Sequence, residues 1–500
     1  MGVYRSRFGR GLDGDVLGYL SSLGEDLEIL FWDLVGSEAH VVMLVEEGII
    51  SADHGSRILQ VLEELKSMYH EGRLKVGGEY EDIHEFVEGY LVERLGIDVG
   101  GRVHIGRSRN DQVALDVRLR VRELLLEVWE SVLGLVETLL RRARDERDSI
   151  MLLYTHLQQA QVGLLSHYLI AVVDHLLRDL ERVKECYRRV NKCPLGASAS
   201  GGSLLPLNRD RVAMLLGFEG IVENSLDAVG SRDWVLEAAS ACSIIMTHLS
   251  RIAEDLVIWA TDEFRYIDFP DELASPSSIM PHKKNPAVVE LVRARAGRVA
   301  GNLIHIIVSL KSTPTGYSID LQETKPPLFE ALKHTRDSLR IMEKVFSRII
   351  FRREKMLESA LRSYAPAVDL AEALVKYSGL SLREAHRVVG EIVRRLVAKG
   401  LPISSITVNE VCEVSEKLIG RRVELCEETL KTCLDPRKVV ELRATRGSPN
   451  PREIDRMTES RLKIVDDERH VLEDEKRRVS NALTRLEERV REIIGGRASP

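Results

Sequence analysis

The stretch at residues 112–146, QVALDVRLRVRELLLEVWESVLGLVETLLRRARDE, contains a single glycine and no proline. Its apolar residues recur mostly three or four positions apart, a spacing that places side chains on one face of an α-helix. The stretch therefore predicts one helix much longer than the usual 11–12 or so residues. The apolar positions are Val113, Val117, Val121, Leu124, Val128, Val132, Leu135, Val136 and Leu139.

Further long helical patterns cover about 156–189, 232–261, 285–311 and 326–356. Helices of this length are common in bundles, where neighbouring helices share one core. We therefore expect an all-α fold of three mostly helical domains around a central long-helix bundle. The expected divisions are an N-terminal helical domain at 1–105, the bundle at 106–360, a C-terminal helical domain at 361–455, and a charged helical tail at 456–500.

The tail carries an apolar residue every seven positions, at Val465, Leu472, Val479, Leu486 and Ile493. This spacing is typical of a coiled-coil seam, and also of a helix that lies with one face on the protein body. We favour the docked or solvated helix, and keep a role in a larger assembly as the alternative.

The amino-acid composition excludes several classes of function. The 71 basic and 78 acidic residues give a net charge of −7, without the clustered basic excess of nucleic-acid-binding proteins. No apolar run is long enough to span a membrane. The N-terminal segment lacks the apolar core of a secretory signal, and the six cysteines form no CxxC pair. We expect a cytoplasmic protein with free thiols, no metal, and no nucleic-acid or membrane partner.

The segment at 275–286, SPSSIMPHKKNP, is the first candidate for chemistry. Its three prolines oppose regular structure, and a long helical pattern begins at its end. Asn285 suits the N-cap of that helix and Pro286 suits its first position. Free backbone N–H groups at a helix N-terminus favour anions. The segment is either an anion-binding catalytic loop or a capped loop with solvent-facing lysines.

Two shorter segments carry paired charges. In RSRNDQ at 107–112, two arginines flank a serine just before the long helix, and arginine binds carboxylates through two parallel hydrogen bonds. In EDIH at 81–84, Asp82 and His84 could orient a basic substrate group or pair with each other. The alternatives are an N-capped helix with surface arginines and a charge cluster at a helix start.

Two further segments precede helical patterns. THLQ at 155–158 fits a capping box opening the next helix, which would place His156 in the first turn as a neutral proton acceptor. YSIDLQETKPP at 317–327 supplies Tyr317, Gln322 and Lys325 ahead of another helix. Taken alone, the first is more often structural and the second is a loop.

Together these segments resemble the argininosuccinate lyase family of the fumarase/aspartase superfamily, over residues of about 1–455. The run SSIMPHKKNP at 277–286 is similar to the superfamily signature SSxMPxKxNP. The more specific resemblance to argininosuccinate lyases lies elsewhere, in RSRNDQ at 107–112, EDIH at 81–84, ENSLDAV at 223–229 and DLQE at 320–323.

The resemblance implies a homotetramer with a tetrameric bundle core, in which each active site draws on three subunits. It implies cleavage of argininosuccinate into fumarate and arginine by an anti-elimination, as part of arginine biosynthesis and with no cofactor. The implied catalytic residues are Ser277 as base, His156 as the imidazole that assists proton transfer, Lys283 as the cation for the enolate-like carboxylate, and Glu290 as the support of the histidine. The implied substrate-binding residues are Ser22, Asp26, Asp82, His84, Arg109, Asn110, Thr155, Asn285, Tyr317, Gln322 and Lys325.

The chain departs from the family pattern at Pro276, His282, Ile105 and Gly230-Ser231, and none of these has an assigned role. Pro276 stiffens the catalytic loop, while the tail after about 460 extends past the family's usual end. The alternatives to argininosuccinate cleavage are another fumarate-releasing lyase, such as adenylosuccinate lyase, and a structural protein similar to delta-crystallin.

Overall fold

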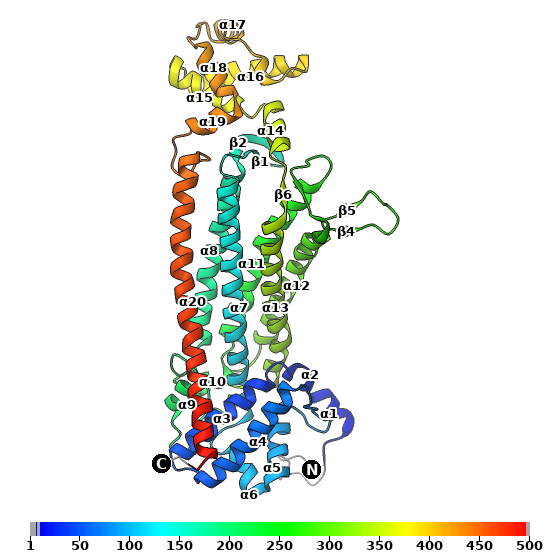
Figure 1. Ribbon diagram of the computed structural model, residues 1–500, viewed down its shortest axis with the longest axis vertical. Helices are drawn as coiled ribbons and strands as arrows, with labels where there is room; N and C mark the ends of the chain where they lie inside the picture. Colours follow the sequence, from blue (N-terminus) through cyan, green and yellow to red (C-terminus); the bar gives the residue numbers. More distant parts are fainter. Residues whose placement is uncertain (1–6, 8–10, 497–500) are drawn as a thin grey trace.

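The computed structural model describes residue 7 and residues 11–496. The molecule is a long bundle with a smaller group of helices at each end (Figure 1). This arrangement confirms the all-α expectation. Five helices form the bundle, namely α7 (Arg109–Asp145), α8 (Leu165–Val190), α11 (Asp233–Ala260), α12 (Ala287–Leu310) and α13 (Lys325–Arg348).

Helix α7 is the centre of the bundle and packs against α8 and α13. It begins with a capping box, in which Ser108 and Asp111 satisfy backbone N–H groups at the helix start. Its apolar residues are buried along nearly the whole length, as the spacing predicts. Burial on this scale stabilises a helix far more than intrinsic propensity does.

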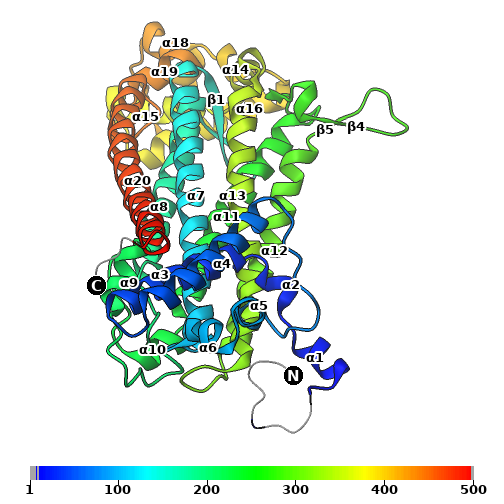
Figure 2. The ribbon, with the colours of Figure 1, turned by 60° about the horizontal axis from the view of Figure 1, so that its bottom comes forward.

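The N-terminal end of the bundle carries a group of mostly shorter helices, seen from below in Figure 2. They are α1 (Gly14–Leu20), α2 (Leu23–Asp26), α3 (Leu30–Glu46), α4 (Ala52–His70), α5 (Ile83–Leu95), α6 (Ile97–Gly100) and the 3-10 turn Gly101–His104, and near them lie α9 (Arg209–Leu215) and α10 (Ser225–Gly230). Helix α3 packs on α4 and on α7, so this end shares a hydrophobic core with the bundle.

The opposite end carries α14 (Arg353–Arg362), α15 (Ala367–Ser378), α16 (Leu382–Lys399), α17 (Val408–Ile419), α18 (Glu427–Leu434) and α19 (Pro436–Leu442). Buried residues between Leu370 and Leu434 form a hydrophobic cluster separate from that of the bundle. Helices α15, α16 and α17 pack on one another in sequence order, which gives this end a local core.

The expected helix start at Thr155 is wrong. Residues Ile150–Thr155 (β1) and Gln158–Leu164 (β2) form an antiparallel hairpin, and helix α8 begins only at Leu165. His156 and Leu157 form its turn, each with a φ of 55°. Short apolar runs fit a strand as well as a helix, and here the two runs pair with each other instead of continuing into α8.

Two other expected helix boundaries also differ. Asn285 pairs with Ser275 in a two-residue ladder between β4 (Ser275–Pro276) and β5 (Lys284–Asn285), so Pro286 and not Asn285 is the N-cap of α12. The pattern at 326–356 is interrupted by β6 (Ile350–Phe351), which pairs with β3 (Ile267–Asp268). In both places a local strand pairing overrides the helical pattern.

The tail forms α20 (Pro451–Ile494), which runs along the outside of the bundle from end to end (Figure 1). Its heptad residues Val465, Leu472, Leu486 and Ile493 are buried against the body, which confirms the docked helix. Ion pairs join it to three other helices, namely Arg461 with Asp174 of α8 at 2.9 Å, Lys476 with Glu130 of α7 at 2.8 Å, and Arg489 with Glu46 of α3 at 2.8 Å.

Replacement of Leu472 tests the docking of α20. Leu472 is fully buried, whereas its neighbour Val471 is 42% exposed. The variant Leu472→Ala should lose about 2–5 kcal/mol of stability because it leaves a cavity in the seam. Denaturant unfolding of Leu472→Ala and of the control Val471→Ala checks this, and equal small losses would show that the seam contributes little.

Candidate active site

A cavity of about 120 Å³ lies where the N-terminal helices meet the bundle. It brings together most of the substrate-binding residues that the sequence predicts, although they come from segments far apart in the chain. Its lining consists of Asp26, Glu81, Asp82, His84, Arg109, Asn110, Val113, Tyr317, Ile319, Gln322 and Lys325.

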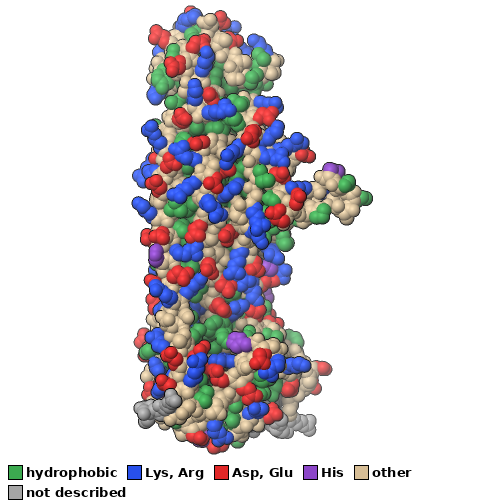
Figure 3. Space-filling view, viewed as in Figure 1, with side chains coloured by type: hydrophobic (Ala, Val, Ile, Leu, Met, Phe, Trp, Pro, Cys, Tyr) green, Lys and Arg blue, Asp and Glu red, His purple; other side chains and the backbone are tan. Residues whose placement is uncertain are grey.

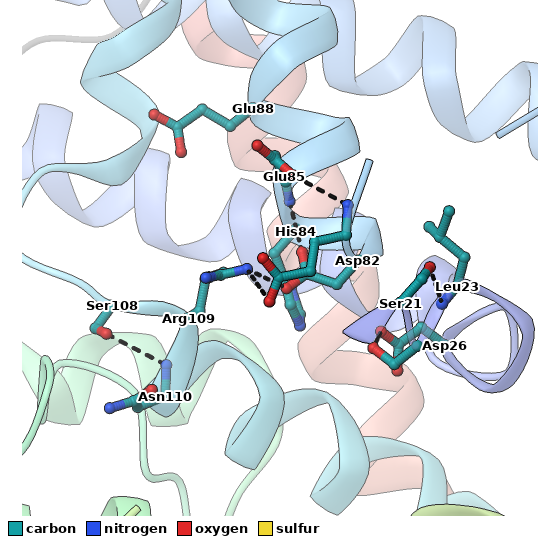
Figure 4. Close-up of polar contacts among 12 residues, drawn as sticks. Ser21, Leu23, Asp26, Asp82, His84, Glu85, Glu88, Ser108, Arg109 and Asn110 are labelled. Carbon is teal, nitrogen blue, oxygen red and sulfur yellow. Dashed lines mark hydrogen bonds and ion pairs between the residues drawn. The ribbon is translucent and has the colours of Figure 1, made fainter. Parts of the chain in front are cut away.

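The starts of two helices meet at this cavity (Figure 4). Asp82 is the N-cap of α5 and accepts a hydrogen bond from the backbone N–H of Glu85 at 2.8 Å. Arg109, the first residue of α7, donates to Asp82 at 2.7 Å. Burial alone would raise the pKa of Asp82, but the charges of His84 and Arg109 outweigh it and lower that pKa. The segments 81–84 and 107–112 therefore form one charged cluster.

A second pair of charges closes another side of the cavity. Lys325 and Asp26 form an ion pair, and both side chains are almost fully buried. Ser22 donates its hydroxyl hydrogen to the other carboxylate oxygen of Asp26 at 2.6 Å. A buried ion pair is costly to separate, so this contact fixes the 22–26 segment against the start of α13.

Tyr317 and Gln322 lie beside these pairs, on the segment that leads into α13. Burial raises the pKa of Tyr317, which keeps its phenol protonated at neutral pH. The tyrosine hydroxyl and the glutamine amide can both form hydrogen bonds with a polar ligand. The cavity thus combines fixed charges with neutral hydrogen-bonding groups.

Behind His84 lie two carboxylates that sequence reasoning missed. Asp33 of α3 and Asp116 of α7 are buried, with oxygens 3.0 Å and 3.7 Å from His84 Nδ1. Burial opposes a charged histidine, yet Asp33 and its neighbours raise the pKa of His84 to about 9. Both acids interrupt apolar helical runs, a signal that could have been used, because a buried charge requires a partner.

These three residues are also the one group of potential metal ligands among the described residues. However, the ring nitrogen that faces both carboxylates already makes a hydrogen bond to Asp33. A histidine–carboxylate ion pair therefore accounts for the cluster. All six cysteines are free, and the structure places none of them in the cavity.

The remaining predicted residues lie in two other places. Thr155 and His156 are exposed at the tip of the β1–β2 hairpin, near the opposite end of the bundle from the cavity. The β4–β5 loop, with Ser277 and Lys283, projects from the body as an arm (Figure 3). A single chain therefore holds three groups of predicted site residues and does not bring them together.

Within the arm, Ser277 Oγ accepts a hydrogen bond from the backbone N–H of Met280 at 3.0 Å and a longer one from Ile279 at 3.4 Å. Lys283 is exposed, while Asn285 is partly buried at the base of the loop. Glu290 lies in the first turn of α12, and among the described residues no hydrogen bond joins it to His156. Lys284 is held by Asp268 and Asp271 at 3.3 and 3.1 Å, so it is less available than Lys283 to a ligand.

Solved structures of known proteins share this fold. EDDS lyase in complex with formate matches with a TM-score of 0.87 and 31% identity, covering 97% of this chain and 95% of that one. Class II fumarase from Schistosoma mansoni matches with a TM-score of 0.70 and 17% identity over 86% of this chain and 96% of that one, which indicates a shared fold.

Comparison of sequences is more specific. A lyase family model matches residues 25–301, and an argininosuccinate lyase C-terminal model matches 364–441. The argininosuccinate lyase of Methanothrix thermoacetophila is 40% identical, covering 97% of this chain and 98% of its own, and that of Nitrosopumilus maritimus is 38% identical over 98% and 100%. Because this coverage includes much of the tail, α20 is not an extension relative to these proteins. The chain belongs to the argininosuccinate lyase family of the fumarase/aspartase superfamily.

Proposed function

We propose that this chain is a carbon–nitrogen lyase that cleaves argininosuccinate into fumarate and arginine, as part of arginine biosynthesis in the cytoplasm. The observation that most strongly supports this proposal is the cavity, which is built from segments 22–26, 81–84, 109–110 and 317–325. Its alternating cations and carboxylates complement a substrate that carries carboxylates at one end and a guanidinium group in the middle.

The binding roles follow from the charges. Arg109 and Asn110 bind the succinyl part, since guanidinium and amide groups donate hydrogen bonds to carboxylates. Asp82 holds Arg109 in place, and His84 lies beside them. The rest of the substrate contacts Ser22, Asp26, Tyr317, Gln322 and Lys325, where an acid, a base and neutral hydrogen-bonding groups surround the same space.

The chemical step requires a base, because the proton is removed from the carbon next to a carboxylate. Its removal places a second negative charge on that carboxylate, which preorganised donors must stabilise. Ser277 is the base, and its oxyanion is stabilised by backbone N–H groups of the kind that Ile279 and Met280 already direct at it. Lys283 and Asn285 stabilise the carboxylate as charge develops on it.

The departing nitrogen requires a proton from an acid, and His156 on the hairpin is our candidate for it. His156, next to Thr155 at the exposed tip, acts as the imidazole of this step, and Glu290 supports it. His156 is exposed at the hairpin tip and no hydrogen bond joins it to Glu290 among the described residues, so we propose that the two residues pair between subunits. No step of this chemistry needs a metal or a cofactor.

We further propose a homotetramer built on the bundle. Helix α12 buries only Val289, Val292, Val299 and Ile306, and it exposes a second apolar face. An exposed apolar surface of this kind marks an interaction site. Its members are Ile304, Ile307 and Val308. Antiparallel association of copies through this face would place the bundle end that carries the hairpin of one subunit beside the end that carries the cavity of another (Figure 1).

The domain division at 1–105, 106–360, 361–455 and 456–500 is retained as a proposal with one refinement. The separate hydrophobic cluster of the C-terminal end contains residues between Leu370 and Leu434, while Val439 and Val440 belong to the bundle's cluster. This clustering favours an end of the C-terminal domain before α19.

A direct assay tests the proposed reaction. Purified protein should release fumarate, measured by its ultraviolet absorbance, from argininosuccinate and not from adenylosuccinate or aspartate. Release from adenylosuccinate instead would identify a different lyase. No release from any of the three by a folded tetramer would favour the crystallin-like structural role.

Substitution of the serines tests the base. Ser277→Ala should lower kcat by about 10²–10⁴-fold, the usual contribution of a positioned base, with little change in KM. Ser278→Ala is the matched control on the same loop and should stay near full activity. An active Ser277→Ala would remove Ser277 from this role.

Charged substitutions on the exposed apolar face of α12 test the proposed homotetramer. The double variant Ile304→Asp/Ile307→Asp should form smaller species in light scattering, because it buries carboxylates in the proposed interface, and should lose activity with them. Val397→Asp, on an exposed position of α16, controls for added surface charge. A double variant of unchanged mass would place the interface elsewhere.

A further inference from the structure

The buried cluster of Asp33, His84 and Asp116 joins three helices behind the cavity. Asp33 comes from α3, His84 from the first turn of α5, and Asp116 from α7. His84 Nδ1 is 3.0 Å from Asp33 and 3.7 Å from Asp116. Gln112, one turn before Asp116, donates to the same Asp33 oxygen at 3.3 Å. Such contacts fix the orientation of the imidazole ring.

The charges around the ring favour its protonated form. The groups that face it are Asp33 from α3, Asp116 from α7 and Asp82 from the start of its own helix. The cationic groups near this cluster are Arg107, whose charge acts on Asp116, Arg109, which pairs with Asp82, and His104, on which the charge of His84 acts. A neutral imidazole would take from the buried Asp33 the one ion-pair partner that it has among the described residues, which is costly, whereas Asp82 would keep Arg109 at 2.7 Å.

A second buried histidine of the same end provides the contrast. His40 makes its hydrogen bond to the backbone carbonyl of Ile105 at 2.8 Å, and no carboxylate of the described residues pairs with it. Burial and the charge of Arg107 lower the pKa of His40 to about 3. Burial therefore neutralises His40, whereas the carboxylates keep His84 charged.

The other nitrogen of His84 is unused. Nε2 is buried and has no hydrogen-bond partner among the described residues, while the side chain lines the cavity. A buried N–H without an acceptor is unfavourable, and a ligand carboxylate in the cavity would supply one. The remaining cations of the cavity, Arg109 and Lys325, already face Asp82 and Asp26.

We propose that Asp33 and Asp116 are positioning residues that hold His84 as an imidazolium, with Nε2–H directed to a carboxylate of the substrate. This inference rests on the proposed function. It adds that recognition of the anionic substrate depends on Asp33 and Asp116, two acids outside the cavity lining. Affinity for dicarboxylates should then be constant at neutral pH and fall as the pH rises through about 9, where His84 loses its proton.

Binding of succinate, an unreactive dicarboxylate, tests this without turnover. Calorimetry in buffers of different ionisation enthalpy measures the protons taken up on binding. At pH 7.5 the unmodified protein should take up few protons when it binds succinate, because His84 is already charged. Asp33→Asn should move the alkaline loss of binding down by about one to three pH units and should raise proton uptake at pH 7.5.

Three further variants separate this role from a structural one. The double variant Asp33→Asn/His84→Gln should lose the extra proton uptake that Asp33→Asn shows. The single variant His84→Gln should weaken succinate binding by roughly ten- to a hundred-fold. Asp116→Asn should act in the same direction as Asp33→Asn but more weakly, since the Asp116 oxygen is more distant and since burial and the charge of Asp33 raise the pKa of Asp116 and so reduce its charge. Asp53→Asn, at an exposed position of α4, is the matched control.

The outcomes separate this inference from the proposed function. If Asp33→Asn folds, by circular dichroism, and binds succinate with unchanged pH dependence and proton uptake, the positioning role is wrong, even if the protein cleaves argininosuccinate. If Asp33→Asn does not fold, the pH dependence of succinate binding and the proton uptake are measured on Asp116→Asn instead. Unchanged values in that variant would contradict the positioning role. If the protein does not cleave argininosuccinate but the variants show the predicted proton uptake, the proposed substrate is wrong and the positioning role stands.

Discussion

The pairing of buried charges at the start of α7 is the interaction on which the site depends. The same helix turn supplies the capping residue Asp111 and the cation Arg109, and Asp116 follows about two turns later. Asp111 and Asp116 are buried within the bundle and cannot turn to solvent, while Arg109 is partly exposed. Asp111 accepts hydrogen bonds from backbone N–H groups of Gly196 and Ser198, whereas Asp116 and Arg109 pair with His84 and Asp82, which line the cavity.

This constraint makes the cavity a rigid and preformed site. Ion pairs from α2, α5 and α13 fix its walls, and the ring of His84 is held from behind by two further helices. Charged groups held in place before the ligand arrives lose little entropy on binding. The groups proposed for the chemistry lie instead on a hairpin tip and an extended loop, elements that can adjust when subunits meet.

Much of this arrangement could be predicted from the sequence. The long helices follow from the apolar spacing, and the docked tail follows from its seven-residue repeat. The hairpin at 150–164 could not be predicted, because its apolar runs fit either period and only their mutual pairing selects strands. Asp33 and Asp116 were missed because their partner is remote in sequence, although an acid within an apolar run signals a buried pair. The joining of segments 81–84 and 109–110 depends on tertiary packing.

The central claim is that the cavity of one subunit is completed by the loop of another, and activity of mixed tetramers tests it most directly. Arg109→Gln removes a cavity group and Ser277→Ala removes the base, so each variant alone should be inactive toward argininosuccinate. Tetramers containing both variants should recover a substantial fraction of activity, because some sites combine an intact cavity with an intact loop. Mixed tetramers, verified by mass, that stay inactive would contradict the account.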